Sequence, residues 1–305
     1  MEDKTTSKQT TPRSYWDAIV SNRSHAKSLQ SDGNTSGHEL FEKMATLNIN
    51  YRINEERHHR CPDCWYCNIR CVCDLMPTKI DREDLPNNVK ILLLLHHKEY
   101  LNAGNSAKSL IALLPKENIE LYVYGKEGDF DRCIDEMMID QGRQTAILWP
   151  GENAIPVEQF TSSCRSIHIN NSKTTKVGSD VGTSKNNKAE KQQTQIIRIV
   201  ALDGTYKNAK NMHKTIRRRL NEEKSTMPVC IALHPKSVSQ FHRAKKNYGA
   251  AIHDNLKANE RLDERALRVS TAEACALLLM EHGAKEIVQE KIMKALLVNN
   301  CNRTT

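Results

Sequence analysis

Residues 196–212 read IIRIVALDGTYKNAKNM, in which a buried strand turns directly into a helix. The first seven residues are apolar and mostly β-branched except for Arg198, a composition typical of a strand buried on both faces. Beyond Tyr206, apolar residues recur at spacings of three and four: Ala209, Met212, Ile216 and Leu220. This spacing predicts a helix. Residues 203–206 therefore lie on a tight turn at the edge of an α/β sheet, where ligands bind. At Gly204 we expect backbone angles that other residues avoid, and close approach of a ligand.

Strands and helices alternate along residues 89–298. The predicted strands are 89–96, 120–125, 145–149, 196–202 and 229–233. The predicted helices are 39–53, 107–114, 130–138, 207–220, 274–280 and 284–298, and residues 160–169 form a short strand or helix. Such alternation predicts an α/β fold with a largely parallel sheet and helices on both faces.

Five cysteines lie between Cys61 and Cys73 in the run RCPDCWYCNIRCVCD. A Cys-x-x-Cys pair places two sulfurs on one zinc ion, and zinc prefers four such ligands in a tetrahedron. We expect a structural zinc knuckle in residues 57–75 with these ligands: Cys61, Cys64, Cys71 and Cys73. Alternatively Cys67 replaces Cys64, or His58 or His59 contributes. A redox-active CPDC disulfide is less favoured, because no βαβ pattern starts at that point.

Two segments lack core-forming residues. Residues 1–38 are rich in Ser, Thr, Asn and Lys and predict a disordered tail, and residues 170–195 predict a flexible basic insertion. The insertion is either a spacer or an arm that holds RNA. The remainder, residues 39–300, is expected to form one domain.

The net charge of +8 favours an anionic partner such as RNA.

Several classes of protein are not supported, because the chain lacks their motifs. The sequence contains no P-loop, no Gly-x-Gly-x-x-Gly after a strand and no Gly-x-Ser-x-Gly elbow. It contains no apolar run of about 18 residues, so we expect no membrane partner. The polar first 30 residues predict no signal peptide, and we expect the protein in the cytosol, the nucleus or both.

Five blocks in order resemble the DTW-domain family. They are the cysteine motif, a His/Glu turn at His97 and Glu99, the turn Pro150-Gly151, the Asp-x-Thr-aromatic turn at residues 203–206, and Ser-Thr-x-Glu at residues 270–273. The family usually has Trp where this chain has Tyr206, and Pro where it has Lys98. The last block also reads as a capping box that opens a helix.

The resemblance implies a tRNA-uridine aminocarboxypropyltransferase. Such an enzyme moves the 3-amino-3-carboxypropyl group of S-adenosylmethionine to N3 of a tRNA uridine, giving acp3U and methylthioadenosine. The family is related to the SPOUT class, so the resemblance also implies a SPOUT-like sheet with a knotted carboxy-terminal half. Two alternatives stay open: a SPOUT-type RNA methyltransferase, and a non-catalytic zinc-knuckle RNA-binding protein.

The resemblance, together with the residues on the three strand-end turns, predicts which residues form the site. We expect catalytic roles at Asp203, Thr205 and Tyr206. We expect S-adenosylmethionine to contact Pro150, Gly151, Leu202, Gly204, Ser270, Thr271 and Glu273. We expect tRNA to contact His97, Glu99, Lys207, Lys210, Arg217 and Arg268. Asp203 either takes the proton of uridine N3 or holds the amino group of the cosubstrate. We expect no DNA partner.

Overall fold

The computed structural model describes residues 37–53, 60–164, 196–234 and 269–301. Six strands form one sheet in the order β2-β1-β5-β3-β6-β4, and every neighbouring pair is parallel. The strands are β1 (Val89–His96), β2 (Ile119–Tyr124), β3 (Thr145–Leu148), β4 (Ile155–Pro156), β5 (Ile197–Asp203) and β6 (Val229–Ala232). The predicted α/β fold with a parallel sheet is confirmed. All seven residues of β5 are buried, as a central parallel strand requires.

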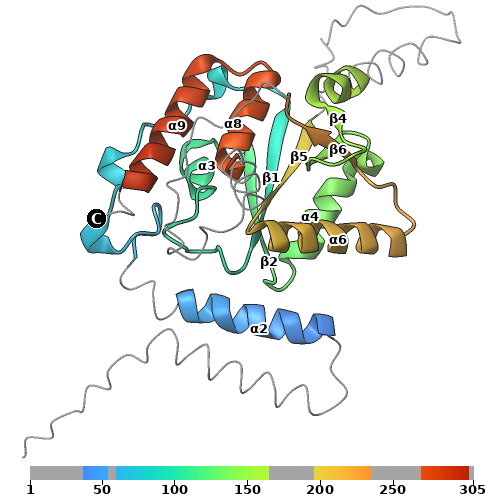
Figure 1. Cartoon of the computed structure of the whole chain (residues 1–305), viewed down its shortest axis with the longest axis horizontal. Helices are drawn as coiled ribbons and strands as arrows, with labels where there is room; N and C mark the ends of the chain where they lie inside the picture. Colours follow the sequence, from blue (N-terminus) through green and yellow to red (C-terminus); the bar gives the residue numbers. More distant parts are fainter. Residues whose placement is uncertain (1–36, 54–59, 165–195, 235–268, 302–305) are drawn as a thin grey trace, which may run out of the picture.

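Helices cover both faces of the sheet (Figure 1). One face carries α3 (Lys108–Leu113), helical residues 157–164, α8 (Thr271–Glu281) and α9 (Glu286–Cys301). The other face carries α4 (Asp129–Met138) and α6 (Tyr206–Glu222). Short 3-10 turns occupy Asn68–Arg70, Cys73–Leu75, Arg82–Asp84 and Ile139–Gly142. An outlying helix, α2 (Gly37–Tyr51), lies on the side of the sheet where α6 begins.

The chain leaves β1 and β5 toward opposite faces. After β1 it enters α3 on one face, and after β5 it enters α6 on the other. These two strands are neighbours, with Leu95 in register with Asp203. Open α/β sheets bind ligands where connections diverge in this way, at the carboxyl ends of the strands. We call this place between β1 and β5 the crevice.

The predicted strands and helices are confirmed in the described residues, with local differences. β5 extends one residue further than predicted, so that Asp203 ends the strand and the turn begins at Gly204. The two-residue strand β4 was not predicted, because its Ile-Pro pair is too short to show a period. The open alternative at 160–169 resolves as helix over 157–164.

The expectation for the backbone of Gly204 was wrong. Its φ angle is not in the positive range, unlike that of Gly125. The space around the glycine is tight instead: a Cβ at Gly204 would lie 3.3 Å from the Cβ atoms of both His96 and Asn208. Absence of a side chain thus lets the start of α6 pack against the end of β1.

Three further expectations fall outside the described residues. They concern the amino-terminal tail within residues 1–36, the basic insertion 170–195, and Arg268. The path of residues 165–195 and 235–268 also decides whether the carboxy-terminal half is knotted, so the knot stays a prediction. Within the described part of the chain, no helix combines the length and apolar character needed to cross a membrane.

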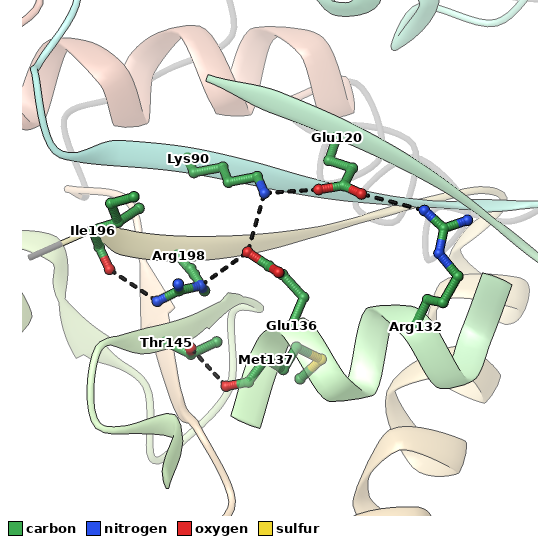
Figure 2. Close-up of polar contacts among 8 residues, drawn as sticks. All are labelled: Lys90, Glu120, Arg132, Glu136, Met137, Thr145, Ile196 and Arg198. Carbon is green, nitrogen blue, oxygen red and sulfur yellow. Dashed lines mark hydrogen bonds and ion pairs between the residues drawn. The ribbon is translucent and has the colours of Figure 1, made fainter. Parts of the chain in front are cut away.

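A partly buried ion network joins three strands to α4 at the opposite edge of the sheet from the crevice. Figure 2 shows Oε1 of Glu136 accepting from Lys90 Nζ and Arg198 Nε, each at 3.1 Å. Lys90 also pairs with Glu120 at 2.7 Å, and Glu120 with Arg132 at 3.4 Å. Burial alone lowers the pKa of Lys90, but the hydrogen bonds to Glu120 and Glu136 outweigh it and raise that pKa.

Replacing Glu136 with Ala should destabilise the protein by about 3 kcal/mol, because it removes the acceptor that the buried guanidinium of Arg198 shares with the partly buried Lys90. The free energy of unfolding from urea titration measures the loss. Glu222→Ala is the matched control: its ion pair with Arg218 is mostly exposed, so we expect less than about 0.5 kcal/mol. Equal losses in both variants would contradict this role for Glu136.

Candidate functional site

The carboxyl edge of the sheet gathers three of the predicted turns. His97 and Glu99 follow β1, Pro150 and Gly151 follow β3, and the Asp203 turn follows β5 between them. The strand order makes β1 and β3 the two neighbours of β5, so turns separated by about 50 residues each along the chain share one edge. Glu99 accepts a 3.0 Å hydrogen bond from Asn102 Nδ2 within its own loop.

Asp203 is held from the loop that follows β1. Its side chain is only 4% exposed, and Oδ2 accepts a 2.5 Å hydrogen bond from Asn105 Nδ2. The other side of the Asn105 amide is also used, since Oδ1 accepts from the backbone N–H of Lys108 at the start of α3. Asn105 is therefore fixed at both ends and orients the carboxylate in the crevice.

The beginning of α8 shows the Ser270 half of the predicted capping box. Ser270 is the N-cap, and its Oγ accepts from the backbone N–H of Glu273 at 3.3 Å. Glu273 is buried. One turn further, burial and the nearby carboxylate of Asp203 raise the pKa of Cys275 to about 12. α8 thus packs against the Asp203 end of β5, and Cys275 stays a neutral thiol there.

Thr205 and Tyr206, both predicted to be catalytic, make different contacts in the structure. Thr205 is the N-cap of α6, and its Oγ1 accepts from the backbone N–H of Asn208 at 3.3 Å. Tyr206 is 58% exposed, and its ring stacks on Trp149 with 6.0 Å between centroids. Trp149 was not predicted as a site residue, although it directly precedes the Pro150-Gly151 turn. The cations predicted to contact tRNA, Lys207, Lys210 and Arg217, are exposed along α6.

A pair of buried histidines ends β1. His96 and His97 are 6% and 4% exposed, and their rings lie 4.5 Å apart. The ring of Phe41 in α2 packs edge-on against the ring of His97, with 5.5 Å between the ring centroids. Nδ1 of His97 is buried and has no hydrogen-bond partner among the described residues. Burial, with nearby Lys98, lowers the pKa of His96 to about 4, and burial with neighbouring cations lowers that of His97 to about 3.

Acid should therefore destabilise the fold through these histidines. Their unfolded pKa is about 6.5 and their folded pKa values are lower, so the unfolded state binds more protons below pH 6.5. The stabilising contribution is complete above pH 6.5 and is lost as the pH falls toward 4. We expect about 1–2 kcal/mol per histidine at pH 5. Urea unfolding at pH 7 and pH 5 measures the difference.

His97→Asn should reduce that pH dependence, because the amide does not titrate. An unaltered difference between pH 7 and pH 5 in the His97 variant would contradict the expectation.

The four predicted zinc ligands meet in one cluster. The sulfurs of Cys61, Cys64, Cys71 and Cys73 lie within 4.8 Å of one another. Two pairs, Cys61 with Cys73 and Cys64 with Cys71, are 3.4 and 3.8 Å apart. Sulfurs bound at about 2.3 Å to a tetrahedral zinc lie about 3.8 Å apart, so the donor set fits zinc. Cys67 is outside this cluster, and His58 and His59 lie outside the described residues.

A buried lysine links the cysteine cluster to the crevice. Lys108 is 2% exposed, and its Nζ donates to the backbone oxygens of Cys64 and, at 2.6 Å, Ala103. The same ammonium lies 4.0 Å from the ring centre of Tyr66. Since the backbone N–H of Lys108 holds Asn105, a continuous set of contacts runs from the knuckle to Asp203. Sequence reasoning missed Lys108, because a lysine in the first turn of a helix is usually exposed.

The comparisons with known proteins agree with this arrangement. Residues 58–251 match the DTW domain, and this range contains the cysteine cluster and all three turns at the carboxyl edge. Neither the curated proteins nor the solved structures gave a match.

Proposed function

This chain belongs to the DTW-domain family, and we propose that it transfers the 3-amino-3-carboxypropyl group of S-adenosylmethionine to N3 of a tRNA uridine. The family supports a role in tRNA modification in general. The transfer itself, the cosubstrate and the modified position belong to the proposal.

One observation carries the proposal: a buried carboxylate, oriented by an amide, at the point where the connections of a parallel sheet diverge. Asp203 is fixed by Asn105 at 2.5 Å beside an exposed aromatic ring, Tyr206. A reaction between two bound molecules gains most from such positioning. The sulfonium of the cosubstrate is already a good leaving group, so little further activation is needed.

The bond changes are few. N3 of the uridine loses its proton and attacks the carbon next to the sulfonium, the carbon–sulfur bond breaks, and neutral methylthioadenosine leaves. Asp203 takes the N3 proton, or it binds the amino group of the transferred chain. Its burial strengthens either interaction, because few waters screen the carboxylate.

The residues around the crevice fit a cosubstrate that carries an amino group, a carboxylate and an adenine. Asp203 supplies an acceptor for the amino group, and Gly151 presents backbone without a side chain. His97 adds a buried ring nitrogen without a partner in the described structure.

Mass spectrometry of nucleosides tests the proposal. Purified protein would be incubated with unmodified tRNA and S-adenosylmethionine, and the digested tRNA would be analysed together with the small-molecule products. A uridine that gains the aminocarboxypropyl mass, with equimolar methylthioadenosine, is the expected result.

Other products would replace the proposal with an alternative. A methyl gain with release of S-adenosylhomocysteine would identify a methyltransferase. Binding of tRNA without any mass change, and without binding of S-adenosylmethionine by calorimetry, would identify a non-catalytic RNA-binding protein.

A further inference from the structure

Three aromatic rings form a ladder beside the Asp203 turn. Trp149 stacks on His213 with centroids 4.9 Å apart and planes 9° apart, and on Tyr206 at 6.0 Å and 13°. Tyr206 and His213 are seven residues apart on α6, a separation of about 10.5 Å along the helix axis. The indole of Trp149 therefore lies between the other two rings. We call this set the aromatic ladder.

A groove with cationic walls runs from the ladder along α6. It has a volume of about 990 Å³. Its lining includes Trp149, His213, four cations (Lys210, Lys214, Arg217 and Arg218) and one acid, Glu222. Residues 206, 210, 213 and 217 are spaced by four, three and four, and 214 lies four residues after 210. Tyr206, His213 and these cations therefore share one stripe of the helix. The volume is at the upper end of the range for ligand pockets, so the groove accommodates an extended ligand.

The charge of the groove is available for an anion. Among the described residues, Lys210, Lys214 and Arg217 form no ion pair, whereas Arg218 pairs with Glu222 at 3.7 Å. Arg219 points elsewhere, toward Asp131 and Glu223. Three uncompensated cations in one stripe suit a polymer with regularly spaced negative charges.

Aromatic rings and cations in one groove are the elements of sites for unpaired nucleic acid. Bases stack on aromatic rings when they are not paired, and phosphates follow a cationic groove. A duplex offers phosphates but keeps the faces of its bases covered. The ladder would thus contribute to binding of an unpaired strand and add nothing for a duplex.

We propose that the ladder and its groove bind an unpaired RNA strand: a base stacks on the exposed ring of Tyr206, and the flanking phosphates contact Lys210, Lys214 and Arg217. Trp149 and His213 hold the Tyr206 ring in a fixed orientation next to the Asp203 turn. The inference rests on the proposed function and extends it, since the tRNA segment that carries the target uridine then binds in an unpaired form.

Binding of labelled RNA without cosubstrate tests the inference separately from catalysis. Fluorescence anisotropy would compare single-stranded oligouridine with a blunt RNA duplex of equal length. We expect Tyr206→Leu to weaken binding of the single strand about tenfold and to leave duplex binding unchanged. Tyr206→Trp should retain the affinity, because it keeps an aromatic face.

Two further variants separate stacking from charge. Trp149→Leu should weaken binding of the single strand selectively. Lys214→Ala should weaken binding of both RNAs and reduce the slope of log affinity against log salt by about 1. Arg82→Ala is the control, because Arg82 pairs with Glu117 beside the amino end of β2, and it should change neither affinity.

The RNA-binding results can overturn this inference whether or not the transfer reaction occurs. Equal loss of both RNAs in the Tyr206→Leu variant, or unchanged affinity for the single strand, would overturn the inference even if acp3U forms. Weaker binding of S-adenosylmethionine by that variant, with unaltered RNA binding, would also overturn it and assign the ladder to adenine. Tyr206 is largely exposed, so its replacement does not threaten folding.

Discussion

Replacing Asp203 with Asn should lower the rate of acp3U formation by about 100- to 10,000-fold, the usual contribution of a positioned proton acceptor. The substitution keeps the size of the side chain and one oxygen that can accept from Asn105, so the crevice should keep its shape. What disappears is the negative charge, and with it the ability to take the N3 proton. Single-turnover rates with unmodified tRNA measure the effect.

The same variant separates the two roles of Asp203. If the carboxylate takes the N3 proton, the dissociation constant of S-adenosylmethionine should stay unchanged while the rate falls. If it binds the amino group of the cosubstrate, that constant should rise, which calorimetry detects. Asp131→Asn is the matched control, because Asp131 is exposed on α4 and, within the described residues, its one ion pair is at 3.5 Å with Arg219. Full activity of the Asp203 variant would refute both roles.

Loss of the zinc knuckle should have the second large effect. Cys64→Ser removes one of four clustered sulfurs, and we expect the zinc content to fall from about one ion per chain to almost none. Structural zinc contributes on the order of 10 kcal/mol in isolated zinc fingers. Here the sheet has its own core, so we expect a smaller loss of stability, on the order of a few kcal/mol.

The loss should reach the crevice as well. The backbone oxygen of Cys64 accepts from Lys108 Nζ, and the backbone N–H of Lys108 holds the side chain of Asn105. A loosened knuckle should therefore release Asn105 from Asp203 and lower the rate of transfer. Metal analysis, thermal unfolding and the transfer assay would be applied together.

Cys67→Ser provides the control within the same motif. Cys67 is only partly buried and lies outside the sulfur cluster, so its variant should keep zinc, stability and activity. Loss of zinc in that variant, or retention of zinc in Cys64→Ser, would mean that the ligand set is wrong.

Local patterns in the sequence predicted much of what the structure contains. The apolar run that became β5 and the spacing of Ala209, Met212 and Ile216 gave a strand and a helix, because side-chain period reports local burial. The Ser-x-x-Glu form at Ser270 predicted the start of α8, because capping needs only residues three apart. The spacing of the cysteines predicted the correct four sulfurs for the same reason: the knuckle is a local structure.

Local patterns could not supply the contacts between distant segments. The role of Gly204 was misjudged because the space around it is set by His96, more than 100 residues earlier. Lys108 was missed because its burial depends on carbonyl oxygens of the knuckle and the neighbouring loop. The spacing of residues along a helix does not indicate hydrogen-bond acceptors that come from other segments.

By itself the sequence determined the strand-to-helix turn at Asp203, the four cysteines that cluster and the alternation that makes the sheet parallel. Only the tertiary structure decided that β5 lies between β1 and β3. That order brings Asn105 to Asp203 and Trp149 between Tyr206 and His213. The physical reason is that strand order follows from how helices from distant parts of the chain cover the two faces of the sheet, whereas side-chain period records only that each strand is buried.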